Sequence, residues 1–432
     1  MKIAICTLGC KVNQYETQAM ERELTARGHA LVPFEGPADA YVVNTCTVTA
    51  VSDKKSRQML RRARKQSPDA VVAVCGCYAQ THPEEVRALD VDLIAGTGDR
   101  MAFLDLLEHA VREREPVVRL DEAMRRRSFE ILPAGGLSAR TRAMLKVEDG
   151  CTNFCSYCII PYARGPVRSL PLAEAEAEAR RLAEEGYREI VLTGIEISSW
   201  GRDLPGKPPL MDLVEAVCRA AEGVRVRLGS LEPRTVTEDF CRRGSVLPNL
   251  CPHFHLSMQS GCDATLARMN RKYDTKRYKK SVDLLNGFFD RPAVTTDWIV
   301  GFPGETEEEF SATLAFVRTC GFAAMHVFPY SIRPGTPAAS MAQVPKAVKE
   351  DRAARAAAAA EEMRRDYLLG CVGRTFDVLY EQRLDGRYQG HAPNYAAVAA
   401  PGDGLRNRVV PTRITGVENG LLLGELCALP ET

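Results

Sequence analysis

The stretch VEDGCTNFCSYC, residues 147–158, sets three cysteines in a CxxxCxxC array directly after the short apolar run Met144–Val147. An apolar run of this length is typical of a buried strand. Three thiolates so close on one loop can bind three irons of a cubane iron–sulfur cluster and leave the fourth iron without a protein ligand. An iron with a free coordination position can bind a small molecule. The array therefore predicts a reactive cluster on Cys151, Cys155 and Cys158.

Zinc is the other metal that such an array can bind. Structural zinc usually takes four ligands from two Cys or Cys/His pairs. No Cys or His occurs in residues 159–188, directly after the array. The spacing therefore favours a cluster over a zinc knuckle or a buried group of cysteines.

The length and composition describe a multi-domain globular chain. Its 432 residues suggest two to four domains, and 45% hydrophobic with 26% charged residues is an ordinary globular composition. No apolar run approaches the roughly 20 residues that span a bilayer, and the N-terminus lacks a signal-peptide cleavage site. We expect a cytoplasmic protein without a membrane partner. In that reducing compartment, 15 cysteines indicate metal ligands or buried thiols rather than disulfides.

Residues 1–125 alternate short β-branched runs with helical patterns, which predicts a doubly wound parallel α/β domain. The expected strands are Lys2–Cys6, Ala40–Asn44, Ala70–Val74 and Val91–Ala95. The expected helices are Gln14–Arg27, Lys54–Gln66, Pro83–Leu89 and Met101–Arg112. Such sheets bind ligands beyond the carboxyl ends of their strands.

Three cysteines follow successive strands of this domain, namely Cys10, Cys46 and Cys77. The topology brings these strand ends to one edge, so a second cluster with three protein ligands is expected there. The alternative is three unrelated small loop residues. Cys75 competes with Cys77 for the third position, and the residues alone do not decide between them.

A basic, then Pro/Gly-rich linker is expected at 126–140, followed by renewed βα alternation over 141–370. The expected strands are Met144–Val147, Glu189–Leu192, Arg225–Leu228, His253–Leu256, Val294–Val300 and Ala324–Phe328. The expected helices are Pro171–Glu185, Met211–Ala221, Val236–Arg243, Thr275–Gly287 and Glu305–Thr319. This is a partial barrel of six βα units, short of the eight of a closed one. Its functional residues should lie at the strand carboxyl ends, where glycine-bearing turns contain Gly194, Gln259 and Gly301.

After a long helix at Pro345–Leu369, residues 371–432 change to short strands separated by Gly, Asn and Pro. The pattern predicts a small antiparallel β-barrel, a fold that nucleic acids commonly bind. Acidic residues slightly outnumber basic ones here. RNA binding would therefore depend on locally placed arginines: Arg383, Arg387, Arg406, Arg408 and Arg413.

The net charge of +1 indicates no general affinity for nucleic acid, but two runs are locally basic. One is on the helix at residues 54–65, and the other approaches the cysteine array over residues 125–146. Each run is either an ordinary solvated face or part of a polyanion-binding surface.

The array, with an aromatic residue before its last cysteine, resembles the radical S-adenosylmethionine (SAM) superfamily. The longer string DGCTNFCSYCIIPYARG, residues 149–165, resembles its methylthiotransferase branch. Further strings resemble the members that act on N6-threonylcarbamoyladenosine in tRNA: Thr7–Thr17 (TLGCKVNQYET), Asn44–Val48 (NTCTV), Lys54–Gln58 (KKSRQ), Gly76–Gln80 (GCYAQ), Cys155–Gly165 (CSYCIIPYARG) and Ser331–Ala338 (SIRPGTPA).

The resemblance implies three domains: a methylthiotransferase α/β domain at 1–125, a radical SAM partial barrel at 141–370 and an RNA-binding TRAM domain at 371–432. It selects Cys77 over Cys75, because the family places its third ligand in a Gly-Cys-x-Ala-Gln context. It also implies SAM contacts at Tyr157, Gly194, Gln259 and Gly301. This sequence departs from the family at Trp298 and around Glu196, both expected at the barrel mouth.

The chemistry implied by the resemblance needs two 4Fe-4S clusters and no general base. SAM bound at the Cys151, Cys155 and Cys158 cluster would be cleaved reductively to a radical, and the Cys10, Cys46 and Cys77 cluster would hold a sulfur that a second SAM methylates. The methylthio group would go to carbon 2 of the modified adenosine at position 37, in the anticodon stem-loop. The other implied partners are a low-potential electron donor such as flavodoxin or ferredoxin, and a sulfur source.

Two alternatives remain from the sequence. A sister methylthiotransferase would act on isopentenyl-adenosine in tRNA or on an aspartate of a ribosomal protein. A non-catalytic iron–sulfur electron carrier that binds RNA belongs to a different class, and it would release no deoxyadenosine from SAM.

Overall fold

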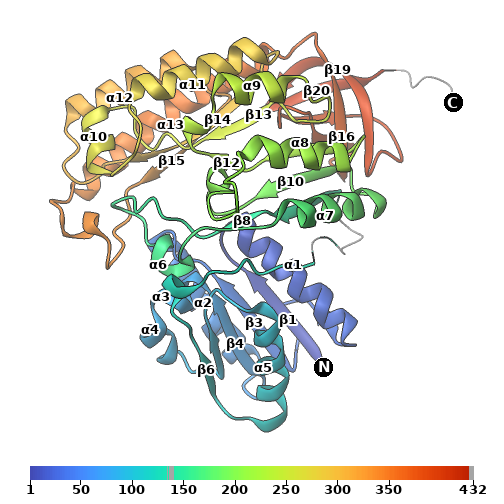
Figure 1. Cartoon of the computed structure of the whole chain (residues 1–432), viewed down its shortest axis with the longest axis vertical. Helices are drawn as coiled ribbons and strands as arrows, with labels where there is room; N and C mark the ends of the chain where they lie inside the picture. The colour runs from blue at the N-terminus through green and yellow to red at the C-terminus, as the bar shows by residue number, and fades with distance from the viewer. Residues whose placement is uncertain (134, 136–140, 428–432) are drawn as a thin grey trace.

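A computed structural model describes residues 1–133, 135 and 141–427. Part of the expected linker at 126–140, and the end of the expected last domain, lie outside these residues. Figure 1 shows a blue N-terminal α/β domain at the bottom, a green-to-orange central domain above it and a red C-terminal barrel at the upper right.

The N-terminal sheet is fully parallel among its described strands, in the order β2-β1-β3-β4-β5-β6. The four expected strands are present as β1 (Lys2–Thr7), β3 (Ala40–Thr45), β4 (Val71–Gly76) and β5 (Leu93–Ala95). The edge strands β2 (Ala30–Val32) and β6 (Val117–Arg119) were not expected. Each has only three residues and is mostly exposed, so it lacks the apolar run of a buried strand.

Helices cover both faces of this sheet, which confirms the doubly wound prediction. Side chains of α1 (Lys11–Ala26) and α5 (Arg100–Glu113) pack on one face. Those of α2 (Ala50–Gln66), α3 (Cys77–Thr81) and α4 (Pro83–Arg87) pack on the other. The short helix α3 was not predicted, because five residues are too few to establish a helical period.

The central domain contains the six expected parallel strands, in two sheets. One sheet is β11-β10-β7, made of β7 (Arg142–Lys146), β10 (Glu189–Thr193) and β11 (Arg225–Leu228). The other adds the two-residue β12 (Ser230–Leu231) to β13 (His253–Leu256), β14 (Ala293–Val300) and β15 (Ala324–Pro329). A bridge between Val226 and Leu250 lies where the two sheets meet.

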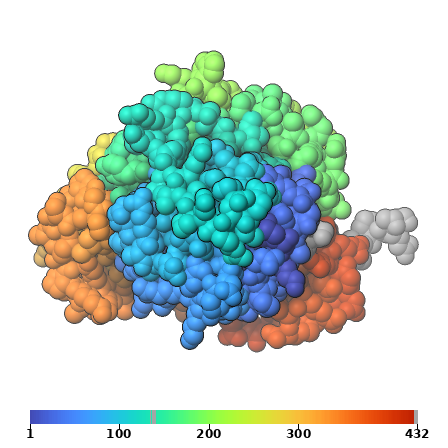
Figure 2. Space-filling model, turned by 90° about the horizontal axis from the view of Figure 1, so that it is seen from below, coloured from blue at the N-terminus to red at the C-terminus, as the bar shows by residue number. Residues whose placement is uncertain are grey.

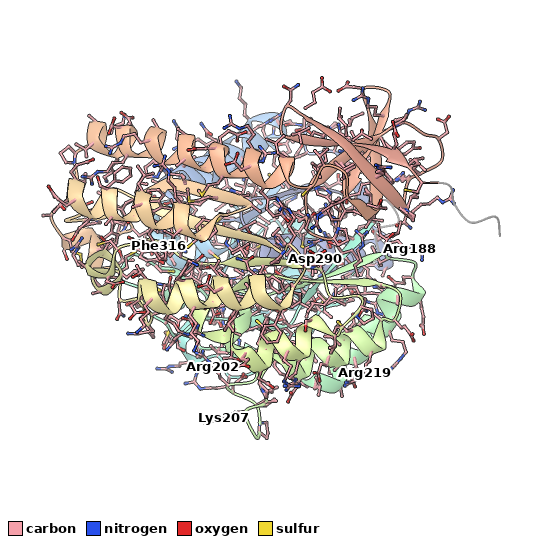
Figure 3. The ribbon with its side chains drawn as sticks, turned by 90° about the horizontal axis from the view of Figure 1, so that it is seen from above. Arg188, Arg202, Lys207, Arg219, Asp290 and Phe316 are labelled. Carbon is pink, nitrogen blue, oxygen red and sulfur yellow. The ribbon has the colours of Figure 1, made fainter. Side chains whose placement is uncertain are left out.

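Helices surround these sheets on the outside, as Figure 3 shows from above. The expected helices are α7 (Leu172–Glu184), α8 (Leu210–Ala220), α9 (Glu238–Ser245), α11 (Thr275–Phe288), α12 (Glu307–Cys320) and α13 (Lys346–Leu369). Shorter elements near the cysteine array are β8 (Glu148–Asp149), β9 (Arg168–Ser169), α6 (Ile160–Arg164) and α10 (Asp263–Arg268).

Alternation along the central strands separates an apolar outside from a polar inside. Ile190, Leu192, Val226 and Phe254 pack outward into the main core. The alternate positions point to the opposite side, which we call the inner face: Glu189, Arg225, Arg227, His253, His255, Asp297 and His326. Paired polar groups such as His255 with Asp297, 3.2 Å apart, replace the usual apolar filling of a barrel.

The C-terminal segment forms a closed barrel in the order β16-β17-β18-β20-β19. Its strands are β16 (Thr375–Leu384), β17 (Arg387–His391), β18 (Ala397–Ala400), β19 (Arg408–Glu418) and β20 (Leu421–Leu426). Four pairings are antiparallel, as expected, and the β18–β20 pairing is parallel.

This barrel packs against the amino ends of the central strands. Arg142 Nε donates to Glu381 Oε1 at 2.8 Å, and Arg142 Nη1 donates to the Tyr395 hydroxyl at 3.1 Å. The Tyr395 ring also lies 4.6 Å from the Arg227 guanidinium and 5.1 Å from the His253 ring. The C-terminal barrel therefore covers the end of the inner face that is remote from the cysteine array. No helix within residues 1–133 and 141–427 is long and apolar enough to cross a membrane.

Candidate functional site: two cysteine triads at one rim

The array loop turns sharply at Gly150, directly after β8. Gly150 has φ +88°, and a Cβ there would lie 2.1 Å from the Pro166 carbonyl oxygen, so only glycine fits. The Cys151 amide donates to the Gly165 carbonyl at 3.0 Å, and the Cys158 amide donates to the Cys155 carbonyl at 2.9 Å. The loop is thus held by its own backbone, with its three thiols gathered at the carboxyl end of β7.

These thiols differ in their surroundings. Burial raises the pKa of Cys158 to about 12, and burial also raises the pKa of Cys151. Cys155 Sγ instead accepts a hydrogen bond from Arg271 Nη1 at 3.2 Å. Metal binding deprotonates thiols, so Cys151 and Cys158 would release their protons when a metal binds.

The second triad lies where β1, β3 and β4 end. Cys10 is the N-cap of α1, Cys46 follows β3 and Cys77 begins α3. The charge of Cys10 acts on both Cys46 and Cys77, so the three thiols are neighbours, as the topology predicted. Gly9 allows the close approach, since a Cβ there would lie 2.7 Å from Cys46 Cβ.

Neither triad forms a compact single-ion site. Across the part of the chain that the structure describes, no three Cys, His, Asp or Glu side chains are grouped to hold one metal ion. A zinc knuckle would require such a group.

Cys75 lies apart from this triad. Its side chain is fully buried in the core between the sheet and the helices α1 and α5. Burial raises its pKa to about 11, the behaviour of a small hydrophobic residue. Cys77, by contrast, has Cys10 and Cys46 among its electrostatic neighbours.

The helix α6 connects the two triads. It begins two residues after Cys158, and its Ala163 carbonyl accepts from Thr97 Oγ1 of the N-terminal domain at 2.6 Å. At its end, Arg164 is fully buried, and its charge acts on Cys77. The helix α6 therefore links the segment that carries the array to the segment that carries Cys77.

Arg164 belongs to a buried charge network between the domains. Its Nη2 donates to Asn13 Oδ1 at 2.7 Å and to Glu16 Oε2 at 3.2 Å, and its Nη1 lies 3.3 Å from Asp149 Oδ2. Burial alone would raise the pKa of Glu16, but nearby cations, including Arg164, hold it well below the usual carboxyl range. The further members of the network are Arg100, Glu130, Lys146 and Arg168.

The three glycine-bearing turns reach the cysteine array through one or two intermediate residues. At Gly194 a Cβ would lie 2.7 Å from Glu148 Oε2, and that oxygen accepts from the Glu196 amide at 2.7 Å. The side-chain carboxyl groups of Glu148 and Glu196 both raise the pKa of Cys151. The Gly194 turn thus abuts the first cysteine of the array.

The other two turns contact the array near its second half. Gln259 has φ +66°, and the preceding carbonyls of Ser257 and Met258 accept from the Tyr273 hydroxyl. Tyr273 in turn accepts from Arg271, the partner of Cys155. Beside Gly301, whose φ is +64°, the ring of Phe302 lies 6.3 Å from Tyr157. All four expected SAM-contacting positions therefore lie on one rim.

The expectation that Trp298 lies at the barrel mouth is wrong. Its side chain is fully buried on the outer side of β14 and stacks on Phe310 at 5.3 Å. Strand alternation gives the inner position to its neighbour Asp297 instead. Glu196, by contrast, is half exposed and lies near Cys151, as expected.

The two basic runs differ in the folded chain. In the second run, Arg126 and Arg142 pair with Asp121 and Glu381, whereas Arg125, 80% exposed, forms only a surface pair with Glu122. Arg140 lies outside the described residues. In the first run, several side chains on α2 are exposed and have no ion pair among the described residues: Lys54, Lys55, Arg61 and Lys65.

A loop of the central domain reaches back to the second triad. The buried Arg333 donates to Asp53 Oδ2 at 2.5 Å and to the Thr47 carbonyl at 3.2 Å, next to Cys46. Figure 2, seen from below, shows the N-terminal domain between an orange part of the central domain and the red C-terminal barrel. The loop that contains Arg333 thus packs against the domain that carries Cys46.

Two family models match this chain. The model described as Uncharacterized protein family UPF0004 covers residues 2–96, and that of the Radical SAM superfamily covers residues 145–317. The threonylcarbamoyladenosine tRNA methylthiotransferase MtaB of Bacillus subtilis is 39% identical over 95% of this chain and 93% of its own length. The chain belongs to the radical SAM methylthiotransferase family.

Other relatives in this methylthiotransferase family carry names with different modified adenosines. The MtaB protein of Aquifex aeolicus is 37% identical, covering 82% of this chain and 86% of its own. A tRNA-2-methylthio-N(6)-dimethylallyladenosine synthase of Cereibacter sphaeroides is 35% identical over 98% of both chains. A solved radical SAM methyltransferase, TsrM of Kitasatospora setae, shares the fold with a TM-score of 0.56 at 16% identity, over 78% of this chain and 77% of its own.

Proposed function

We propose that this methylthiotransferase adds a methylthio group to carbon 2 of N6-threonylcarbamoyladenosine at position 37 of tRNA, next to the anticodon. The observation that carries the proposal is the pair of cysteine triads linked by α6, in a chain 39% identical to a threonylcarbamoyladenosine tRNA methylthiotransferase. Radical generation and sulfur delivery must occur close together, because a radical formed on the substrate has to meet the sulfur before it reacts elsewhere.

Cys151, Cys155 and Cys158 would hold the 4Fe-4S cluster that serves SAM, and Cys10, Cys46 and Cys77 a second 4Fe-4S cluster. When bound, these groups supply one-electron reduction of SAM and a site for the transferred sulfur. The charge network between the triads supports this assignment. The network has more buried cations than carboxylates, as expected where anionic thiolate ligands lie close by. Its cations are Arg100, Arg164, Lys146 and Arg168, and its carboxylates are Glu16, Glu130 and Asp149.

The rim residues would position SAM. Tyr157 would lie beside the adenine, Gly194 near the amino-acid portion, Gln259 on the pocket wall and Gly301 near the adenosine. The closeness of these turns to the cysteine array supports this role, through Glu148 beside Gly194, Tyr273 beside the Gln259 turn and Phe302 beside Gly301. In this proposal, the domain at residues 1–125 delivers sulfur, the domain at residues 141–370 generates the radical, and the barrel at residues 371–432 helps to bind RNA.

Two further participants follow from the reaction. Reductive cleavage of SAM consumes an electron, so a low-potential donor of the flavodoxin or ferredoxin type is needed. Sulfur that leaves with each product must be replaced from a sulfur source. The RNA partner is the anticodon stem-loop, which carries the modified adenosine.

Mass spectrometry of the modified nucleosides tests the proposal. The reconstituted enzyme, SAM and a chemical reductant would be incubated with anticodon stem-loops carrying either threonylcarbamoyladenosine or dimethylallyladenosine. We expect the methylthio product only from the first RNA. Product from the second RNA alone would assign the chain to the sister activity. Absence of deoxyadenosine release would instead favour a non-catalytic electron carrier.

A further inference from the structure

Lys11, the residue after Cys10, is an exposed cation surrounded by protein charges. It begins α1, and its side chain reaches solvent, although the surrounding protein partly desolvates the ammonium group and lowers its pKa. Its electrostatic neighbours are nevertheless groups of the central and C-terminal domains, namely Arg142, Glu189, Arg227 and Tyr395. Lys11 therefore extends from the second triad towards the inner face of the central strands.

The carboxylates near Lys11 are already matched by other cations. Glu189 accepts two hydrogen bonds from Arg227, at 2.7 and 2.8 Å. Glu381 accepts from Arg142 at 2.8 Å and is 2.6 Å from the His391 ring nitrogen. Among the residues that the structure describes, no hydrogen bond or ion pair is formed by the Lys11 ammonium group.

A second polar group in this region also lacks a protein partner. His253, only 7% exposed, has no hydrogen-bond partner at Nδ1. Lys11 is one of the charges that act on this ring. A buried polar atom without a partner costs free energy unless a ligand or water satisfies it. The unmatched positive charge and the unmatched nitrogen together describe a place for an anionic, hydrogen-bonding ligand.

The adenosine modifications in the names of this chain's relatives differ in charge and in hydrogen-bonding groups. The threonylcarbamoyl group ends in a carboxylate and carries a hydroxyl group, whereas the dimethylallyl group is an uncharged hydrocarbon. We propose that Lys11 binds the carboxylate of the threonylcarbamoyl group and thereby selects this substrate. The inference rests on the proposed function and extends it to a specificity-determining residue.

Binding of synthetic anticodon stem-loops to the reconstituted full chain, without SAM, tests this role. One RNA carries threonylcarbamoyladenosine and the other carries its methyl ester, which lacks the negative charge. We expect wild-type protein to bind the acid about tenfold more tightly than the ester. Lys11→Met should remove this preference by weakening only the acid, and Lys11→Arg should retain most of it. Lys207→Met, at the periphery in Figure 3, is the matched control and should keep the full preference.

Two outcomes would overturn the role of Lys11. An unchanged preference in Lys11→Met would show that another group reads the carboxylate. An equal loss of affinity for acid and ester would show that Lys11 contacts an RNA phosphate instead. Turnover of the acid-bearing RNA by wild-type protein is measured in parallel. A wild-type enzyme that fails to methylthiolate it would refute the proposed function, which is a separate result.

Discussion

Arg164, at the end of the helix that follows the cysteine array, forms a fully buried ion pair with Glu16 of the N-terminal domain. The pair joins the two triads, because Arg164 lies near Cys77 and Glu16 lies on the helix that begins after Cys10. The arginine has a second acidic partner in Asp149, two residues before Cys151. One guanidinium thus connects the segments that carry both triads.

Arg164→Met should destabilise the whole chain, because it leaves Glu16 and Asp149 buried with one cation fewer. Removing one partner of a buried pair costs about 3–5 kcal/mol. Thermal unfolding followed by circular dichroism should show a clear loss of stability. Arg242→Gln, which breaks a surface pair with Asp239 at 65% exposure, should change stability by less than about 1 kcal/mol. Equal effects of the two variants would contradict a special role for the buried pair.

The sheet edge that gathers Cys10, Cys46 and Cys77 could be predicted from the sequence, but the charge network could not. Cys10, Cys46 and Cys77 each follow a recognisable strand, and parallel strands end at one edge. Glu16 is different, since a glutamate within a helix is usually solvated. It is fully buried because its partners Arg100 and Arg164 come from distant segments, and no local period reports such a contact.

Distant contacts also explain why the second basic run was interpreted as a possible polyanion-binding surface. Arg142 and Lys146 are close in sequence to other cations, which suggested a polyanion-binding surface. Arg142 pairs with Glu381, far along the chain, and Lys146 pairs with the distant Glu16 as well as with the nearby Asp149. Trp298 is a further case, since its neighbour Asp297 occupies the inner position and the alternation places the indole outside.

Cysteine substitutions should separate the two triads by their products. Alanine at Cys151, Cys155 or Cys158 should abolish deoxyadenosine release from SAM. Alanine at Cys46 should leave this release measurable and stop methylthiolation. Liquid chromatography with mass spectrometry quantifies both products, and Cys75→Ala is the matched control because Cys75 lies in the core. Methylthio product from Cys46→Ala protein would contradict the sulfur-delivery assignment.

Arg271 should raise the reduction potential of the cluster held by the array. Hydrogen bonds and positive charge near a cluster sulfur stabilise its reduced form. Arg271 Nη1 donates to Cys155 Sγ at 3.2 Å, so Arg271→Met should shift the midpoint potential to a more negative value. A redox titration followed by electron paramagnetic resonance measures this shift. Arg271→Lys should restore part of it, and the exposed Arg202→Gln (Figure 3) should leave the potential unchanged. An unaltered potential in Arg271→Met would exclude this role.

The exposed lysines of α2 should contact tRNA phosphates. Lys54 and Lys55 lie in the first turns of α2, which begins shortly after Cys46. Each phosphate contact that is lost lowers the slope of log affinity against log salt by roughly 0.7–0.9. Lys54→Gln with Lys55→Gln should therefore weaken tRNA binding most at low salt and reduce this slope. Fluorescence anisotropy over a salt series measures both. The matched control is Lys276→Gln with Lys280→Gln, which removes the same charge from the outer helix α11. An equal change of slope in both double variants would mean that net charge alone, rather than a contact at α2, governs the affinity.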